Sequence, residues 1–427
     1  MGASCVGNCC SNDYDRKINN REKIIKIYKE NENEQDKILE LMENNDINIE
    51  ESDNKGNIAL FLACREKMEN VALELIKIGR DKLRHINNNN NSAILCACAN
   101  NMNKVALELI NDNSDGFEKV DEYGNTALIY ACKKGMLETA LKLIESGKSN
   151  PEQINRCNNT ALIYACNSKM PEVALKLIDT GKSVPEQICA QETTALMVAC
   201  YENMSDVALK LIDTEKSVPE QINCKNDTAL IWACRNKMPN VALKIIDTGK
   251  SVPEQIDQYN NTALIYACQT NMNTVALKLI ETGSCIPEHV DNLGGTALMW
   301  ACENDMSNVA LELINTGKSV PEKICNRGNT ALILACWNKM SKVALKLIEV
   351  NKSVLNQVND KQNTALIWAC ENKMSEVALK LIETRNSVPE HINANEDTAL
   401  ILAKKNEMTD VILKLEEIEK INKFLHH

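Results

Sequence analysis

The sequence predicts an all-α solenoid of short helix-turn-helix units with long connecting loops. The tripeptide Thr-Ala-Leu begins at nine positions spaced by 34 residues, from Thr126 to Thr398. Two weaker copies, Ile58-Ala59-Leu60 and Ser92-Ala93-Ile94, keep the same frame upstream. A fixed period of this length is typical of a repeat architecture in which each unit contacts only its neighbours. Although 427 residues would otherwise suggest two or three globular domains, we expect one array.

The repeat frame divides the chain into four segments. We expect a flexible N-terminal leader over residues 1–23 and a degenerate N-terminal capping repeat over residues 24–57. Ten repeats of 34 residues follow over residues 58–397, and residues 398–427 form a C-terminal capping repeat. Lys404 stands in this last unit where earlier units have Cys, as suits a polar cap that faces water.

Two short helices are predicted in each unit. Thr364 exemplifies the N-cap of the first helix, because its hydroxyl can accept a backbone N–H. The second helix begins at the position of Ser375, where two other units have Pro171 and Pro239, and Pro suits a first helical turn. Ala, Leu, Val and Ile recur at helical spacing in both segments.

The second helix is expected to end at a left-handed Gly or Asn in most units. Glu215 and Arg385 replace them in two units, where we expect a strained or differently ended helix. In the loop that follows, Ser183-Val184-Pro185-Glu186 has the spacing of a capping box. This spacing allows one extra helical turn inside the connection.

Cys and Met are numerous enough to suggest a metal site, but most of them recur at one fixed position of successive repeats, which we call a column. Ten of the 19 cysteines share one position, and 11 of the 15 methionines share another. Stacked helices lie roughly 8–10 Å apart, whereas a disulfide needs Cα atoms about 4.4–6.8 Å apart. We therefore expect buried, reduced, small hydrophobic residues and no metal. A third column supplies half-buried aromatic residues: Tyr130, Tyr164, Trp232, Tyr266, Trp300 and Trp368.

Composition excludes several function classes. The net charge is −11 and the isoelectric point is about 5.2, which argues against a nucleic-acid partner. No run of 18 apolar residues is present, and the N-terminus does not resemble a secretory signal, so we expect a cytoplasmic chain. The outer charges are predicted to form exposed i,i+3 ion pairs: Lys142/Glu145, Lys176/Asp179, Lys210/Asp213, Lys346/Glu349 and Lys380/Glu383.

These motifs resemble the ankyrin repeat family. Thr-Ala-Leu-Ile-Trp-Ala-Cys, Val-Ala-Leu-Lys-Leu-Ile and a Gly such as Gly249 follow the family's order and spacing across residues 58–427. Ala replaces the family's Pro, Ile or Met replaces its His, Cys replaces its second Ala, and the loop is one residue longer. The tetratricopeptide repeat also has 34 residues, but its helices are longer and its joints shorter than this pattern indicates.

The resemblance implies a non-enzymatic scaffold that binds a protein partner on a concave face. Positions that vary between units lie at the end of the first helix and at the loop tips. Large aromatic or Arg residues at such positions are the usual hot-spot types. The predicted partner-binding residues are Lys133, Lys134, Arg156, Tyr201, Arg235, Tyr259, Gln269, Arg327, Trp337 and Glu371.

The N-terminus resembles an acylation site. Gly2 follows Met1, and Cys5, Cys9 and Cys10 lie close behind it, as in myristoylated and palmitoylated chains. A single myristoyl chain binds membranes only marginally, so a second lipid would be needed for a stable anchor. We expect tethering to the cytoplasmic face of a membrane as an accessory feature.

Two other function classes were weighed. An enzyme is disfavoured because the sequence contains no Gly-rich phosphate loop, metal-spaced cluster or nucleophile–base pair, and we expect no cofactor. The alternative is an adaptor that recruits host degradation machinery or modulates host signalling, as ankyrin-repeat proteins of large DNA viruses and intracellular bacteria do. Heavy use of Asn, Ile and Lys fits an AT-rich genome of that kind, but no second recruiting domain is visible.

Overall fold

The computed structural model describes residues 52, 55–78, 85–112, 116–350, 355–384 and 386–425. The predicted leader, the acylation residues, nearly all of the degenerate repeat and Arg385 lie outside this part of the chain. Within the described ranges the structure is α-helical, and extended pairing is confined to the isolated bridges Ile86–Ser92 and Val290–Thr296. The predicted all-α class is confirmed. The chain divides into two compact units, Met1–Ser217 and Val218–His427.

Helix pairs follow one another in both units. Unit 1 contains α3 (Ala59–Arg65), α4 (Glu69–Ile78), α5 (Ala93–Ala99), α6 (Asn103–Asn111), α7 (Ala127–Lys133), α8 (Leu137–Glu145), α9 (Ala161–Asn167), α10 (Pro171–Asp179), α11 (Ala195–Tyr201) and α12 (Ser205–Asp213). Unit 2 contains α13 (Ala229–Arg235), α14 (Pro239–Asp247), α15 (Ala263–Gln269), α16 (Asn273–Glu281), α17 (Ala297–Glu303), α18 (Ser307–Asn315), α19 (Ala331–Trp337), α20 (Ser341–Val350), α21 (Ala365–Glu371), α22 (Ser375–Glu383), α23 (Ala399–Lys405) and α24 (Thr409–Leu425).

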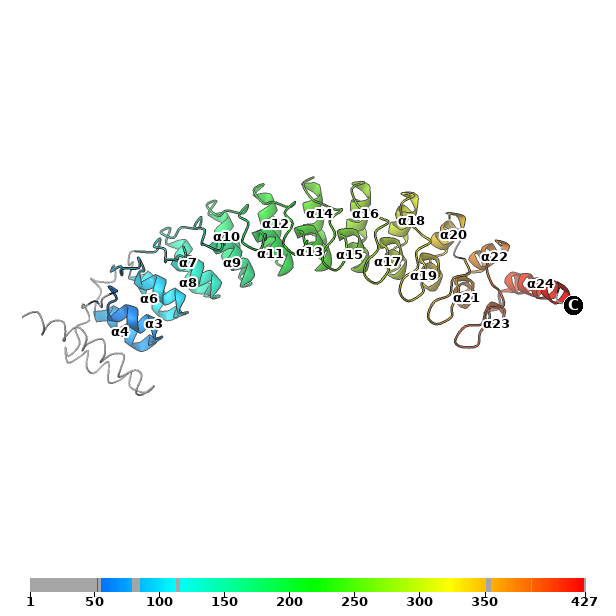
Figure 1. Cartoon of the computed structure of the whole chain (residues 1–427), viewed down its shortest axis with the longest axis horizontal. Coiled ribbons are helices and arrows are strands. Elements are labelled where there is room, and N and C mark those ends of the chain that lie inside the picture. Colours follow the sequence, from blue (N-terminus) through cyan, green and yellow to red (C-terminus); the bar gives the residue numbers. More distant parts are fainter. Residues whose placement is uncertain are drawn as a thin grey trace, which may run out of the picture. The chain divides into compact units, whose positions relative to one another are not determined.

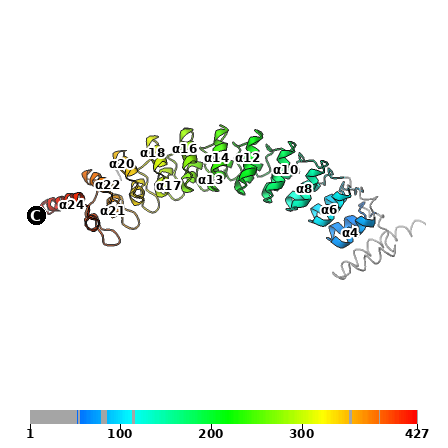
Figure 2. The same cartoon turned by 180° about the vertical axis from the view of Figure 1, so that it is seen from behind.

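The pairs stack in two layers within each unit. The first helices contact each other, as α13 does α15, and the second helices do the same, as α14 does α16 (Figures 1 and 2). Each apolar helix face is therefore covered by its own partner and by the neighbouring pair. A hairpin loop leads from each second helix to the next Thr.

Local sequence explains where the helices begin. The hydroxyl of Thr364 accepts the N–H of Ile367 at 3.2 Å, which confirms the predicted N-cap. The second helices begin after a Met without a side-chain cap, and Pro171 and Pro239 occupy the first helical position as predicted. Their fixed φ suits a first turn, where no amide hydrogen is needed.

Backbone conformation explains where the second helices end. Gly147, Gly181, Gly249, Gly283 and Gly317 all have φ near +67°, the left-handed conformation that terminates a helix. Glu215 adopts φ of +58° at the same position, so the expected strain is present there in a residue with a side chain.

The loop contains one hydrogen-bonded turn in place of an extra helix. The N–H of Gln187 donates to the Val184 carbonyl at 3.1 Å, and no helical residue follows in that described loop. The Ser that would open a capping box is engaged elsewhere: the hydroxyl of Ser149 donates to the Leu143 carbonyl at 2.9 Å. This serine position therefore ties the loop to the end of the second helix.

The predicted columns form the core. Cysteines of the repeated column are buried at 0% exposure from Cys64 to Cys370, and the methionines from Met68 to Met408 are also buried. Burial raises the pKa of the Cys166, Cys234 and Cys370 thiols to about 12. The column therefore behaves as a line of small uncharged residues. Lys404, which replaces the cysteine in the last unit, is exposed as expected and pairs with Glu416 at 2.8 Å.

Asparagine side chains hydrogen-bond successive first helices to each other. In unit 2, the residue after the first helix is Asn at positions 236, 304, 338, 372 and 406 and Thr at position 270. The Nδ2 of Asn372 donates to the carbonyls of Cys336 and Trp337, both at 3.0 Å, at the end of the preceding first helix. A helix leaves its last carbonyls without intrahelical partners. This asparagine satisfies them from the next repeat.

A second set of amides connects neighbouring hairpins. The Oδ1 of Asn155 accepts the N–H groups of Cys157 and Asn159 in its own turn. Its Nδ2 donates at 2.8 Å to Asn125 of the preceding hairpin. Equivalent amide contacts join Asn87 to Asn57, Asn359 to Asn329, and Asn393 to Asn363. The same side chain thus shapes its own turn and connects it to the preceding hairpin.

The outer ion pairs differ in part from the prediction. Lys346/Glu349 and Lys380/Glu383 pair within one helix at 3.4 and 3.7 Å, as expected. The prediction is wrong for Lys176 and Lys210, which reach back to Glu145 and Asp179 of the preceding repeat at 3.7 and 3.0 Å. A carboxylate one repeat away is as accessible to the flexible lysine as one that is three residues away. These exposed pairs contribute little to stability.

We expect Asn372→Ala to destabilise unit 2 by about 1–3 kcal/mol, because two carbonyls lose their donor. Urea unfolding followed by circular dichroism measures the change. The matched control is Asn395→Ala, which removes an exposed asparagine side chain at a hairpin tip and should leave the urea midpoint nearly unchanged. Equal effects of the two substitutions would show that the inter-repeat hydrogen bonds contribute nothing measurable.

Thiol reactivity should follow burial. Cys157 and Cys224 are exposed, whereas Cys166 and Cys234 are buried and have raised pKa values. Since the thiolate is the nucleophile, N-ethylmaleimide at pH 8 should label Cys157 and Cys224 in the native chain. It should label the buried column only after denaturant is added. Peptide mass mapping separates the two sets, and rapid native labelling of the column would contradict the packing described above.

Candidate partner-binding face

The variable residues gather where first helices end and the next hairpin begins. We call this surface the helix-1 face, and it is described separately in each unit. In unit 1 it carries Lys133, Lys134, Arg156 and Tyr201; in unit 2 it carries Arg235, Tyr259, Gln269, Arg327, Trp337 and Glu371. The last residue of a first helix lies against the next repeat, where it meets an aromatic ring or a hairpin tip.

In unit 1 the predicted residues are mostly exposed. The ammonium of Lys133 lies 5.5 Å from the ring centroid of Tyr164, which suits a cation–π contact. Lys134 is exposed at the end of α7, and Arg156 is exposed at a hairpin tip, where its backbone N–H donates to the Tyr123 carbonyl at 2.9 Å. Tyr201 is 53% exposed at the end of α11.

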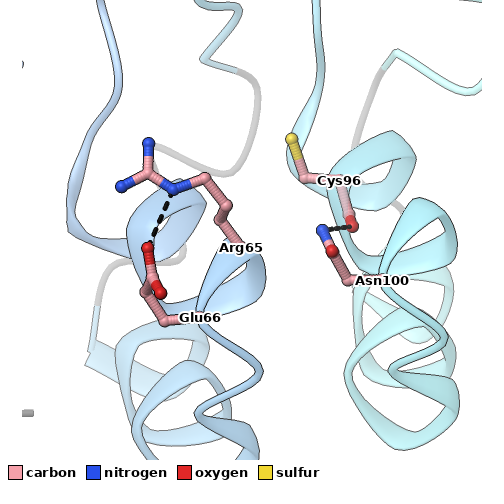
Figure 3. A network of polar contacts seen from close by, with 4 residues as sticks. All are labelled: Arg65, Glu66, Cys96 and Asn100. Atoms are coloured by element: carbon pink, nitrogen blue, oxygen red, sulfur yellow. Dashed lines mark hydrogen bonds and ion pairs between the residues drawn. The ribbon is translucent and has the colours of Figure 1, made fainter. Parts of the chain in front are cut away.

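A cleft of about 290 Å³ lies on the same face near the start of unit 1. Its lining includes Arg65, Cys96, Asn100 and Tyr123. Figure 3 shows that Arg65 and Cys96 come from neighbouring first helices, with the Asn100 amide donating to the Cys96 carbonyl at 2.9 Å. Cys96 occupies the position of the aromatic column, so a small side chain stands where later repeats have a ring. Burial raises the pKa of this thiol to about 12, although Arg65 acts in the opposite direction.

In unit 2 the structure brings two of the predicted residues into contact. The guanidinium carbon of Arg235 lies 4.9 Å from the Trp232 ring centroid, 5.0 Å from that of Tyr259 and 5.8 Å from that of Tyr266. Three rings therefore hold one guanidinium at the surface. Tyr259 remains 45% exposed at its hairpin tip.

Trp337 forms the second aromatic feature of unit 2. Its ring centroid lies 6.4 Å from that of Trp368 on the next first helix, with the planes tilted by 44°. Trp337 nevertheless keeps 45% of its surface exposed. A large, partly held aromatic side chain of this kind supplies contact area at low entropic cost.

The other predicted residues of unit 2 differ in their surroundings. Gln269 is partly committed to internal contacts, since its Nε2 lies 3.4 Å from both Asn261 Oδ1 and Asp291 Oδ2. Arg327 is exposed at a hairpin tip, and its carbonyl accepts the Asp360 N–H at 3.1 Å. The carbonyl of Glu371 accepts a hydrogen bond from Asn406 at 3.1 Å. Arg327 therefore offers the most accessible side chain of the three.

Sequence reasoning missed the acids beneath the aromatic column. The hydroxyl of Tyr266 donates to Asp257 at 2.8 Å, and the indole N–H of Trp300 donates to Asp291 at 2.7 Å. Tyr130 donates to Asp121 in the same way, at 2.6 Å. Burial and these acids raise the pKa of Tyr130 and Tyr266 well above the ordinary value. An Asp nine residues before each of these rings is the sequence signal that could have identified the contact.

The described residues contain no group of three or more His, Cys, Asp or Glu side chains placed to hold a metal ion. Among those same residues, no helix combines the length and apolar character needed to cross a membrane.

Comparison with known families agrees with this geometry. A family model described as ankyrin repeats, in three copies, matches residues 73–153, 138–221, 196–290 and 279–357. Together these matches span about two thirds of the chain. The chain belongs to the ankyrin repeat family. A search of curated proteins gives no match for it.

Ankyrin repeats are generally protein–protein interaction modules, and ankyrin repeat proteins are typically non-enzymatic scaffolds. This ankyrin chain departs from the family's Pro and His at the start of the first helix, and the hydrogen bonds between its repeats come from other side chains. Asn372 and Asn155 supply two of them. A third comes from the loop, where His289 Nε2 lies 3.1 Å from the Asn260 carbonyl of the preceding hairpin. The departures therefore leave neighbouring repeats connected.

Proposed function

We propose that this ankyrin chain is a non-enzymatic scaffold that holds a protein partner on its helix-1 face. The observation that supports the proposal most strongly is the exposed aromatic surface of Trp337, whose ring lies tilted beside that of Trp368. Its position is polar or charged in most other repeats, so internal packing does not require a Trp there. Partner binding supplies a reason for an aromatic side chain at this position.

The contrast between positions supports the same proposal. Residues that pack between repeats, such as the Cys and Met columns, are nearly constant because each must fill the same space. Residues at the ends of the first helices range from Lys133 to Tyr201, Arg235 and Trp337. A surface that varies along a constant frame can match one particular partner.

Hot-spot chemistry makes Trp337, Arg235 and Tyr259 the central contacts. Trp, Tyr and Arg dominate measured binding energies in protein interfaces, and truncation of such a residue often costs about 2 kcal/mol or more. Arg235 is held on its rings before a partner arrives, which reduces the entropy lost on binding.

The proposal also retains a lipid tether through Gly2, Cys5, Cys9 and Cys10, which lie outside the described residues. The adaptor role that recruits degradation machinery has no observation in its favour beyond the family, and the scaffold role does not depend on it.

Alanine substitution tests the proposed face. Captured partners from the native host should be recovered with the wild-type chain and lost or much reduced with Trp337→Ala plus Tyr201→Ala. For a purified partner we expect affinity to fall by about ten-fold or more, since 1.4 kcal/mol corresponds to ten-fold.

The matched control is Lys342→Ala plus Glu376→Ala, which alters exposed second-helix residues away from the helix-1 face. It should bind as the wild type does. Urea unfolding of both variants confirms that each remains folded. If the variant with Trp337→Ala plus Tyr201→Ala binds the same partner with the affinity of the wild type, the helix-1 face is excluded as the binding surface.

A further inference from the structure

One junction between hairpins has an acid on both sides, whereas four others join two amides. Each first helix begins at an N-cap Thr. The residue five positions before that Thr lies opposite the residue that directly precedes the N-cap Thr of the previous repeat. Asn359 lies opposite Asn329 in this way, and Asn393 lies opposite Asn363. Each of these contacts joins an amide donor to an amide oxygen. In the second hairpin of unit 2 this register places Asp257 opposite Asp227, so this junction has a carboxyl group on each side.

The two acids have different surroundings. Asp257 accepts the N–H groups of Tyr259 and Asn261 at 2.9 and 2.8 Å and the hydroxyl of Tyr266 at 2.8 Å. Asp227 is completely buried, at 0% exposure, and neither of its carboxyl oxygens receives a well-formed hydrogen bond. Three donors around Asp257 suit a carboxylate. A second carboxylate at Asp227 would be a buried charge without a donor, which is strongly unfavourable.

Arg235 does not neutralise this pair by a direct ion pair. Arg235 lies on the rings of Trp232, Tyr259 and Tyr266 at 4.9–5.8 Å and not in an ion pair with either acid. Lys225 is exposed at the tip of the hairpin that contains Asp227. Burial first, and then the charge of Asp257, raise the pKa of Asp227, while Asn223, Arg235 and Lys225 oppose that change. Asp257, Arg235, Lys225 and the Tyr266 phenol are the titratable or charged groups of unit 2 that face the site.

We propose that Asp227 and Asp257 share one proton, and that release of this proton draws Arg235 from its three rings toward Asp227. The protonated Asp227 hydroxyl donates to Asp257, which replaces the amide donor of other junctions. When the proton passes to solvent, Asp227 becomes an anion, and Arg235, a cation whose charge already acts on Asp227, can compensate it. The junction thus acts as a proton-operated switch whose moving part lies on the helix-1 face; that it regulates partner binding rests on the proposed function.

The direction of the pH effect follows from the raised pKa of Asp227. When a group has a higher pKa in the folded chain than in the unfolded chain, its contribution to stability is fully present at pH values below its pKa in the unfolded chain. For Asp this pKa is about 3.9. That contribution disappears as pH rises through the folded value. Between these two pKa values the folded chain holds a proton that the unfolded chain releases, so the wild-type unfolding equilibrium constant rises by up to about ten-fold per pH unit.

The test compares three full-length chains by urea unfolding across pH 4 to 8. In Asp227→Asn, the new amide can donate to Asp257, as the amides of other junctions donate to their partners. We expect this variant to be more stable than wild type, with an advantage that grows with pH. The matched control, Asn261→Asp, places a second carboxyl opposite Asp291 at the next junction. It should acquire a comparable loss of stability with rising pH.

A second measurement separates movement of Arg235 from simple burial of an acid. The difference in fluorescence between the wild type and Trp232→Phe isolates the emission of Trp232, which Arg235 contacts. In the wild type, the emission of Trp232 should change with pH at the same midpoint as stability does. In the Asp227→Asn variant, the fluorescence difference with and without Trp232→Phe should stay constant with pH. A pH-independent stability difference between wild type and Asp227→Asn, or a constant Trp232 emission, would overturn the proposal. Both readouts use the chain alone, so they succeed or fail independently of whether the helix-1 face binds a partner.

Discussion

The fold depends on polar groups that one repeat leaves unsatisfied and the next repeat satisfies. The last carbonyls of the α19 helix receive both hydrogen bonds of Asn372, and the turn around Asn155 is joined to Asn125 of the hairpin before it. Apolar burial attracts the helices without fixing their register, since dispersion and hydrophobic contacts are not directional. Directional amide contacts at several junctions contribute to that register. The constant Cys and Met columns then fill the space that a fixed register leaves.

This constraint separates the residues available for function from those that are not. Replacement of Asn372 removes the donor to two carbonyls of the preceding helix, and replacement of Asn393 removes the donor to Asn363, whereas Glu371 and Asn395 can change without such a loss. In such a chain, the residues that can bind a partner therefore differ at single positions, while the residues that pack the repeats stay nearly constant. The pair Asp227 and Asp257 is the exception, because it places an unfavourable contact inside the frame itself. Natural chains tend to keep such violations where they serve function.

Local interactions could be predicted from the sequence, and those between repeats mostly could not. The Thr364 cap acts on an amide three residues away, so the tripeptide period was enough to predict it. The acceptors of Asn372 lie 35 and 36 residues away, and nothing within one unit indicates that a variable-looking asparagine is a structural cap. Lys176 was assigned the wrong carboxylate for the same reason.

The candidate site shows the same division. Variation between units identified Arg235 and Tyr259 as surface residues, and both lie on the helix-1 face. Their mutual contact depends on how one helix end meets the next hairpin, which the sequence does not specify. The acids beneath the rings were missed because Asp257 and Tyr266 are nine residues apart and belong to different elements, a turn and a helix.

We infer that the amide contacts between neighbouring repeats are interchangeable, a claim that deletion of one whole repeat can test. Removing residues 330–363 places Thr364 after Asn329, so that Asn393 would face Asn329 and Asn372 would reach the end of α17. We expect this shortened chain to keep its helicity per residue in circular dichroism and to unfold cooperatively in urea. Loss of helicity or of a cooperative transition would contradict the claim, because the register would then depend on contacts particular to the deleted repeat.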